Sequence, residues 1–135
     1  TPFGIHPKKI SFPFWIKNNL ESKKVIPVLT DQYTSPSYVP NISKMIIEII
    51  ERKITGIIHL AGDTKISRYD FAIHIAKITN LNKQFLKLSK MEQMSWEAKR
   101  PIDSSLDVTK AKKILNHKPE KIENSLKLLF NELKN

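Results

Sequence analysis

Residues 56–72 read Gly-Ile-Ile-His-Leu-Ala-Gly-Asp-Thr-Lys-Ile-Ser-Arg-Tyr-Asp-Phe-Ala, and this stretch decides the fold class. The apolar run 57–61, which ends at a glycine, predicts a short strand that is buried on both faces. Ser67 and Asp70 then form the Ser-x-x-acid pattern that begins a helix, and apolar side chains recur at helical spacing up to residue 80. A buried strand that leads into an amphipathic helix is typical of an α/β fold.

The same alternation extends on both sides of this stretch. The other predicted elements are a helix over 12–22, a strand over 25–29 with Pro27 at an edge or a bulge, an ordered functional loop over 31–39, a strand over 85–88, and helices over 108–115 and 122–133. We expect short, largely parallel strands covered by amphipathic helices, in a sheet that continues beyond these strands.

A helix predicted over residues 41–53 has the clearest amphipathic pattern. Its apolar side chains share one face: Ile42, Met45, Ile46, Ile49 and Ile50. The opposite face carries the charged side chains: Lys44, Glu48, Glu51 and Arg52. We expect the apolar face to be buried and the charged face to be exposed.

Length and composition indicate one globular domain or part of one. The 135 residues are 40% hydrophobic and 27% charged, and the first of them is Thr1 rather than Met, as in a fragment of a longer chain. No apolar run approaches the roughly 20 residues that span a bilayer, and residues 1–10 lack the features of a signal peptide. The absence of cysteine agrees with a reducing compartment, so we expect a cytoplasmic protein without membrane association.

The formal net charge of +10 raises nucleic acid as a partner. The lysines and arginines are scattered, however, and they are not interleaved with the aromatic side chains that stack on bases. We therefore expect a solvated basic surface that attracts a small polyanion such as a nucleotide diphosphate, and no nucleic-acid binding.

Residues 99–107 read Lys-Arg-Pro-Ile-Asp-Ser-Ser-Leu-Asp and lead into the helix predicted from residue 108. The guanidinium of Arg100 suits a bidentate grip on phosphate or carboxylate, and Pro101 restricts the backbone on both sides of it. Asp107 is placed to cap the helix. The local chemistry leaves two interpretations open: an anion clamp at a loop-to-helix junction, or a surface arginine before an ordinary cap.

Residues that could catalyse a reaction do not form a self-contained set. The four histidines are far apart and lack metal-ligand spacing: His6, His59, His74 and His117. We expect His59, inside the predicted buried strand, to be structural. The chain has three glycines and no Gly-x-Gly-x-x-Gly, Gly-x-Ser-x-Gly or Tyr-x-x-x-Lys motif. With the histidine spacing, these absences lead us to expect no metal site, no dinucleotide site and no catalytic group in this chain.

Four motifs follow one another along the chain. They are Asp31-Gln32 with Ser35-Pro36-Ser37-Tyr38-Val39, then residues 56–62, then Ser67-Arg68-Tyr69-Asp70-Phe71-Ala72, then Arg100-Pro101-x-x-Ser104-x-Leu106-Asp107. Together they resemble the C-terminal half of the dTDP-4-dehydrorhamnose reductase family, and the similarity covers nearly the whole chain. One departure is Pro36-Ser37, where the family commonly has Pro-Thr.

The resemblance implies a Rossmann-like extended short-chain dehydrogenase/reductase, of which residues 1–135 are the C-terminal substrate-binding portion. An N-terminal half would bind NADPH or NADH and carry a Tyr-x-x-x-Lys pair, so the 135 residues alone would be inactive. The complete enzyme would reduce the 4-keto group of a dTDP-sugar in dTDP-rhamnose biosynthesis. By the same resemblance Arg100 grips the substrate diphosphate. The substrate-binding residues implied are Arg100, Asp31, Gln32, Ser35, Ser37, Trp96 and Ser104.

Two other function classes stay open at this point. The regulatory subunit of methionine adenosyltransferase resembles the same reductases, so the chain could belong to a non-catalytic relative. A basic nucleic-acid-binding domain is the other class, and it predicts binding that depends steeply on salt. If the N-terminal half is missing, unpaired strand edges and exposed apolar faces predict that the chain alone aggregates or forms a homodimer.

Overall fold

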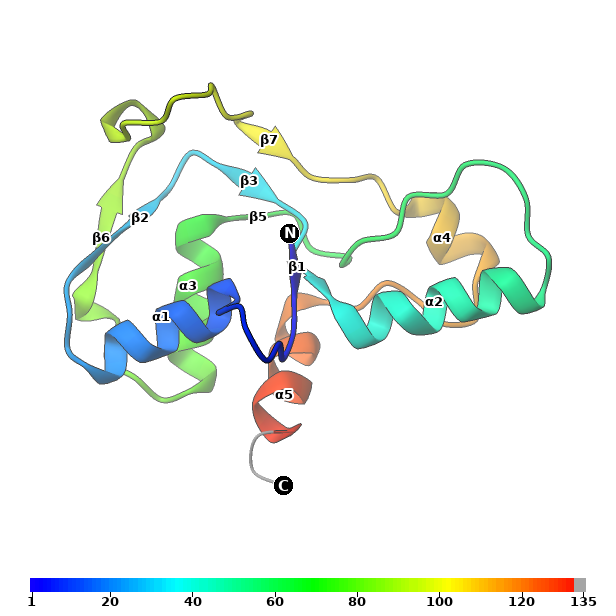
Figure 1. Ribbon diagram of the computed structural model, residues 1–135, viewed down its shortest axis with the longest axis horizontal. Coiled ribbons are helices and arrows are strands. Elements are labelled where there is room, and N and C mark those ends of the chain that lie inside the picture. The colour runs from blue at the N-terminus through cyan, green and yellow to red at the C-terminus, as the bar shows by residue number, and fades with distance from the viewer. Residues whose placement is uncertain (133–135) are drawn as a thin grey trace.

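The computed structural model describes residues 1–132 and has a mixed α/β fold (Figure 1). The helices are α1 (Phe12–Glu21), α2 (Val39–Glu51), α3 (Arg68–Ile78), α4 (Thr109–Ile114) and α5 (Ile122–Glu132), with short 3-10 helices η1 (Lys83–Phe85) and η2 (Met91–Gln93). The strands are β1 (Pro2–Phe3), β2 (Ile26–Leu29), β3 (Tyr33–Thr34), β4 (Ser37–Tyr38), β5 (Ile66–Ser67), β6 (Leu86–Ser89) and β7 (Asp103–Ser104). All the predicted helices are present, although the last residue predicted for the final one, Leu133, lies outside the described residues. None of the helices within residues 1–132 is long and apolar enough to cross a membrane.

The strands form three small sheets rather than one continuous sheet. β2 pairs with β6 in parallel, β1 pairs with β4 in parallel, and β3 lies between an antiparallel β5 and a parallel β7. β3 and β4 divide the segment that was predicted to be a loop. Within residues 1–132, β2 pairs with β6 alone, so β2 is an edge strand. Pro27 of β2 is exposed, and the predicted edge position is confirmed.

The strand predicted over residues 57–61 is wrong for the structure. No strand within residues 1–132 pairs with this segment, and a strand needs a partner for its backbone hydrogen bonds. Ile57 is 81% exposed and His59 is also exposed, so the predicted burial of His59 is wrong as well. The segment becomes buried only at its end, where a Cβ atom on Gly62 would lie 2.0 Å from the carbonyl oxygen of Pro36.

The main hydrophobic core surrounds α3, which packs between α1 and α5 (Figure 1). Phe71 and Ile75 of α3 are fully buried, and the ring of Phe71 lies 5.2 Å from that of Phe12 and 5.7 Å from that of Phe3. Ser67 caps α3 as predicted, because its Oγ accepts the N–H of Asp70 at 3.0 Å. This cap confirms the helix start read from the sequence.

A second, smaller core lies between α2 and α4, and it corrects the predicted faces of α2. Met45 is buried there and Ile42 and Ile49 pack against this core, as predicted. Ile46 and Ile50 of the predicted apolar face are exposed, however, and Glu48 of the predicted charged face is buried. The Glu48 carboxylate accepts backbone N–H groups from Asn116 and His117, at 2.7 and 2.8 Å. These donors turn α2 so that a carboxylate, rather than two isoleucines, faces inward.

Candidate functional site

A cavity of about 390 Å³ lies beneath the loop that joins β6 to β7, residues 90–102, here called loop 90–102. Three of the residues singled out from the sequence line it together: Asp31, Trp96 and Arg100. The remaining lining residues are Met91, Glu92, Met94, Ala98, Lys99 and Ile102. The structure therefore brings side chains more than 60 positions apart to one cavity, which combines acidic, cationic, aromatic and apolar groups.

Loop 90–102 is hydrogen-bonded at one end to Asp31, just before β3, and at the other end to Tyr33 of β3. At its start, the N–H of Met91 donates to both carboxylate oxygens of Asp31, at 3.0 and 3.2 Å. At its end, the N–H of Tyr33 donates to the carbonyl of Ile102 at 2.7 Å. Asp31 thus lines the cavity while its carboxylate holds the loop, which makes it a positioning residue for the side chains that the loop carries.

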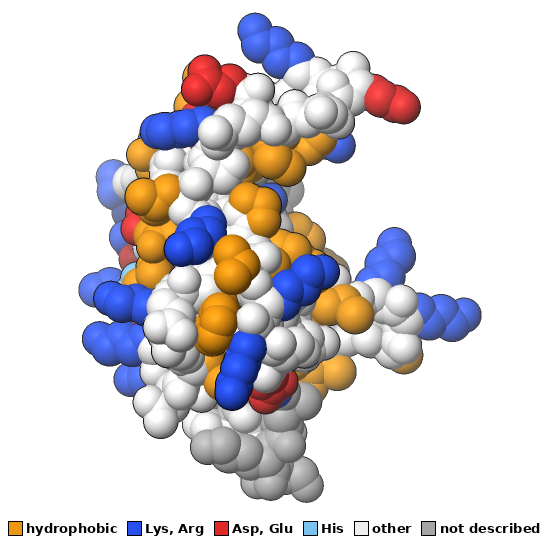
Figure 2. Space-filling view, turned by 90° about the vertical axis from the view of Figure 1, so that its left-hand side faces the viewer, with side chains coloured by type: hydrophobic (Ala, Val, Ile, Leu, Met, Phe, Trp, Pro, Cys, Tyr) orange, Lys and Arg blue, Asp and Glu red, His pale blue; other side chains and the backbone are white. Residues whose placement is uncertain are grey.

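The charges at the cavity leave two cations available to an anion. Lys99 and Arg100 are exposed, and neither forms an ion pair with a carboxylate among residues 1–132. On the face seen in Figure 2, lysines and arginines are spread between apolar side chains rather than gathered in one band. Over the same described residues, no group of three or more histidines, aspartates or glutamates could hold a metal ion.

An ion pair next to the loop strengthens its attachment. The Lys65 ammonium pairs with Asp103 of β7, and Ser105 donates to the same carboxylate from both its hydroxyl and its N–H. The Lys65 ammonium first, and then the Ser105 hydrogen bonds, lower the pKa of Asp103 to about 2. The Asp103 carboxylate is therefore charged at neutral pH, when its ion pair with Lys65 links β7 to the residue before β5.

Gln32 is next to Asp31 in sequence but faces away from the cavity. Its carbonyl accepts the N–H of Arg68 at 3.1 Å, and its side-chain oxygen accepts a hydrogen bond from Arg68 Nε at 3.4 Å. The Arg68 guanidinium also lies 5.2 Å from the ring centre of Phe12. Gln32 thus links the start of β3 to the start of α3.

The three predicted serines hold the backbone around β3, β4 and β7. The buried Ser35 accepts the N–H of Leu106 at 3.2 Å, and the buried Ser37 accepts the N–H of Gly62 at 3.2 Å while donating to the Ser35 carbonyl. The exposed Ser104 donates to the carbonyl of Tyr33 at 3.2 Å. Their hydroxyls are thus engaged in the fold, and none of the three lines the cavity.

Sequence reasoning missed several residues that line the cavity. Lys99 was visible as the other half of a basic dipeptide with Arg100, and that adjacency was the signal that could have found it. Met94 and Ile102 gave no comparable signal, because isolated apolar residues in a loop have no period. Asp107 lies one residue before the N-cap of α4, which is Val108 and has no side-chain cap. The Asp107 carboxylate accepts the N–H of Thr109, the first residue of α4, at 2.8 Å, so it supports the helix start from beside the predicted cap position.

Comparison with known proteins adds a family match to this geometry. The model of the RmlD substrate binding domain matches residues 3–135. A probable low-salt glycan biosynthesis reductase, Agl14, from Haloferax volcanii is 27% identical over 100 residues, which are 74% of this chain and 33% of that protein. The dTDP-4-dehydrorhamnose reductase of Aggregatibacter actinomycetemcomitans is 29% identical over 118 residues, which are 79% of this chain and 40% of that protein.

A solved structure shares the fold. The dTDP-4-dehydrorhamnose reductase of Bacillus anthracis, in complex with NADP, superposes with a TM-score of 0.87 at 22% identity, over 97% of this chain and 46% of that one. This likeness confirms the predicted Rossmann-like reductase fold class. The chain spans between a third and two fifths of the length of the two curated relatives. These relatives are reductases, and they give no support to the alternative of a non-catalytic methionine adenosyltransferase subunit.

Proposed function

The chain belongs to the RmlD substrate binding domain family, and we propose that it holds the dTDP-sugar substrate of a dTDP-4-dehydrorhamnose reductase. In the proposed reaction, the complete enzyme transfers a hydride from NADPH or NADH to the 4-keto group of the sugar, in dTDP-rhamnose biosynthesis. The reductase names of both curated relatives support this reaction class.

The observation that carries the proposal is the cavity beneath loop 90–102. Arg100 presents a planar set of N–H donors that suits a diphosphate, and Lys99 adds a second positive charge beside it. Trp96 offers an apolar wall against which a sugar or a base can pack. We assign binding to these three side chains, and positioning to Asp31, Gln32, Ser35, Ser37 and Ser104.

The residues of this chain do not fit a nicotinamide dinucleotide. A pyrophosphate of that kind is held by a glycine-rich turn before a helix, and none of the three glycines belongs to such a turn. The chain also lacks the tyrosine and lysine pair that would move the proton. We therefore assign cofactor binding and bond making to an N-terminal half of the same enzyme, and we expect residues 1–135 alone to be inactive.

The same N-terminal half is the proposed partner of the exposed face of α2. Four apolar side chains lie along this face, with exposed fractions between 44% and 68%: Val39, Ile46, Ile47 and Ile50. Exposed apolar surface of this kind marks an interaction site. Because the curated relatives are longer than this chain, a covering half is available in proteins of this family. Without it, we expect the chain to aggregate or to form a homodimer.

Steady-state kinetics of the complete enzyme test the proposed function. A charge-assisted bidentate contact is worth about 2–3 kcal/mol, so Arg100→Ala is expected to raise KM for the dTDP-4-keto sugar roughly 30- to 150-fold, with a smaller change in kcat. Lys113→Ala is the matched control, since Lys113 is an exposed cation of α4 outside the cavity. An unchanged KM for the Arg100 variant would overturn the assignment.

A further inference from the structure

A second and larger cavity lies among α1, α3 and α5, at the end of the molecule opposite to loop 90–102 (Figure 1). Its volume is about 790 Å³. Cavities of roughly 300–1,000 Å³ are the usual size for small-molecule sites. None of the residues assigned to the dTDP-sugar lines this cavity, so the proposed function leaves it without a role.

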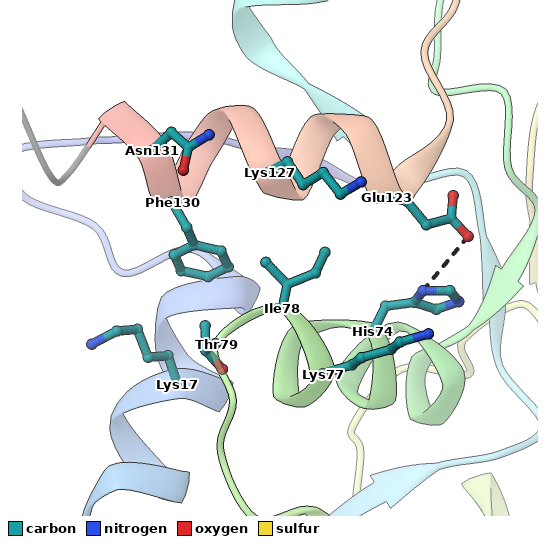
Figure 3. A pocket seen from close by; sticks show the side chains of 9 residues that line it. All are labelled: Lys17, His74, Lys77, Ile78, Thr79, Glu123, Lys127, Phe130 and Asn131. Atoms are coloured by element: carbon teal, nitrogen blue, oxygen red, sulfur yellow. Dashed lines mark ion pairs between the residues drawn. The ribbon is translucent and has the colours of Figure 1, made fainter.

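The floor of this cavity is apolar and rigid. Phe130 of α5 and Ile78 of α3 lie side by side between the two helices (Figure 3). Phe130 is only 8% exposed, and its ring contacts that of Phe14 edge to face, with 6.0 Å between the centres. Because Phe130 is anchored in the main core, the floor is formed before any ligand arrives.

The walls of the cavity carry two lysines that have no ion-pair partner among the described residues. Lys77 projects from α3 and Lys127 from α5 (Figure 3), and neither takes part in an ion pair among residues 1–132. The lining also includes one carboxylate, Glu123, which lies beside His74, and a third lysine, Lys17, which has an acidic partner. His74 lies 3.6 Å from Glu123 across the two helices, and Lys17 pairs with Glu21 at 2.6 Å. Two ammonium groups therefore remain on opposite walls of an apolar floor.

We propose that this cavity binds a small organic anion with a flat apolar body, such as an aromatic carboxylate. The apolar body packs on Phe130 and Ile78, and the acid group accepts hydrogen bonds from Lys77 and Lys127. A ligand held in this way contacts α3 and α5 together, so its binding raises the stability of the folded state. The site is separate from the dTDP-sugar cavity, and it does not depend on the function proposed for that cavity.

Isothermal titration of the complete natural protein with 2-naphthoate tests the proposal, and the neutral 2-naphthylmethanol serves as the matched probe. We expect saturable binding of the acid, about tenfold tighter than that of the alcohol. The double variant Lys77→Gln, Lys127→Gln is expected to weaken binding of the acid at least about tenfold. The control double variant Lys44→Gln, Lys113→Gln removes two exposed charges from α2 and α4, and it is expected to leave the affinity within about twofold.

Four results would overturn the proposal. They are an absence of saturable binding, equal affinity for the acid and the alcohol, equal weakening by the two double variants, and displacement of 2-naphthoate by saturating dTDP. The last of these would assign the anion to the cavity beneath loop 90–102. Circular dichroism of each variant separates loss of binding from loss of fold.

Discussion

Helices α2 and α3 both begin directly after a short strand, but they differ in what covers them. α3 has a side-chain cap at Ser67, and its buried face packs on aromatic and aliphatic side chains from α1 and α5. α2 has no side-chain cap, buries Asn41 and Glu48 beside Met45, and leaves isoleucines exposed. α3 is thus packed on aromatic and aliphatic side chains, whereas α2 is held by a small core and buried polar contacts on one face and exposes isoleucines on the other.

Removing an aromatic ring from the core around α3 should have the largest effect on stability. Phe71→Ala leaves a cavity between Phe3 and Phe12, and we expect it to lower the free energy of unfolding by about 3–5 kcal/mol. Urea denaturation measures this loss. Leu88→Ala on β6 is the control, since Leu88 is 70% exposed, and its effect should stay within about 0.5 kcal/mol. Equal effects of the two substitutions would contradict the described core.

On the α2 side, the polar contacts of Glu48 should contribute stability that depends on pH. The N–H groups of Asn116 and His117, with Arg52, lower the pKa of Glu48 from 4.5 to about 2. Because the folded state has the lower pKa, this stabilisation is present above pH 4.5 and is lost as the pH falls toward 2. Glu48→Gln should therefore lower the free energy of unfolding at pH 7, by less than Phe71→Ala does.

Urea denaturation at a series of pH values checks this prediction. The difference between the wild-type protein and the Glu48 variant should shrink as the pH falls through the window. Asp103 also titrates there, but it does so in both proteins, so the difference isolates Glu48. Glu51→Gln, on the same helix and exposed, should follow the wild-type curve. A pH-independent difference would mean that the charge of Glu48 is not what stabilises α2.

Removing the cap of α3 should cost less than removing its core. In Ser67→Ala the N–H of Asp70 loses its acceptor, and helix caps contribute typically about 1 kcal/mol. Thermal unfolding measures the change. Ser43→Ala on α2 is the matched substitution, because the Ser43 hydroxyl is exposed and only donates back to the carbonyl of Val39. If Ser43→Ala cost as much as Ser67→Ala, the contrast between the two helix starts would be wrong.

The exposed face of α2 should matter least to stability and most to association. Ile50 is 68% exposed, so Ile50→Glu is expected to change the free energy of unfolding by at most about 0.5 kcal/mol. In sedimentation of residues 1–135 the same substitution should shift the chain toward monomer. Leu88→Glu, at an equally exposed site on β6, should leave association unchanged. Equal association of the two variants would exclude α2 as the docking face.

The sequence predicted those helices and strands whose own residues carry a regular apolar pattern or a local cap. Helix periodicity predicted α3 and its cap, and short apolar runs predicted the strands β2 and β6. The strand predicted over residues 57–61 was wrong, because an apolar run does not reveal whether another strand pairs with it. The sequence also misplaced Glu48 on α2, since the N–H donors to its carboxylate lie 68 and 69 positions away and leave no periodic signal.

The part of the candidate site that depends on neighbouring residues in the sequence was predictable. An arginine before a proline drew attention to the loop that we propose binds the diphosphate, and the structure brings Arg100 to the same cavity as Trp96 and Asp31. The sequence could not show that Asp31 is occupied by the N–H of Met91, 60 positions away. Nor could it show that Ser35 and Ser37 are buried, since burial depends on how the segments after β4 and β7 close over them.

The most direct test of the proposed substrate site is isothermal titration of the complete protein with dTDP-rhamnose, the product of the proposed reaction, because binding is then measured without turnover. The wild-type protein should bind it saturably, and Arg100→Ala should weaken the affinity by about 30-fold or more, which corresponds to a contact of about 2 kcal/mol. The control Lys113→Ala should bind as the wild type does. Unchanged affinity in the Arg100 variant would contradict the assignment of the diphosphate to the cavity beneath loop 90–102.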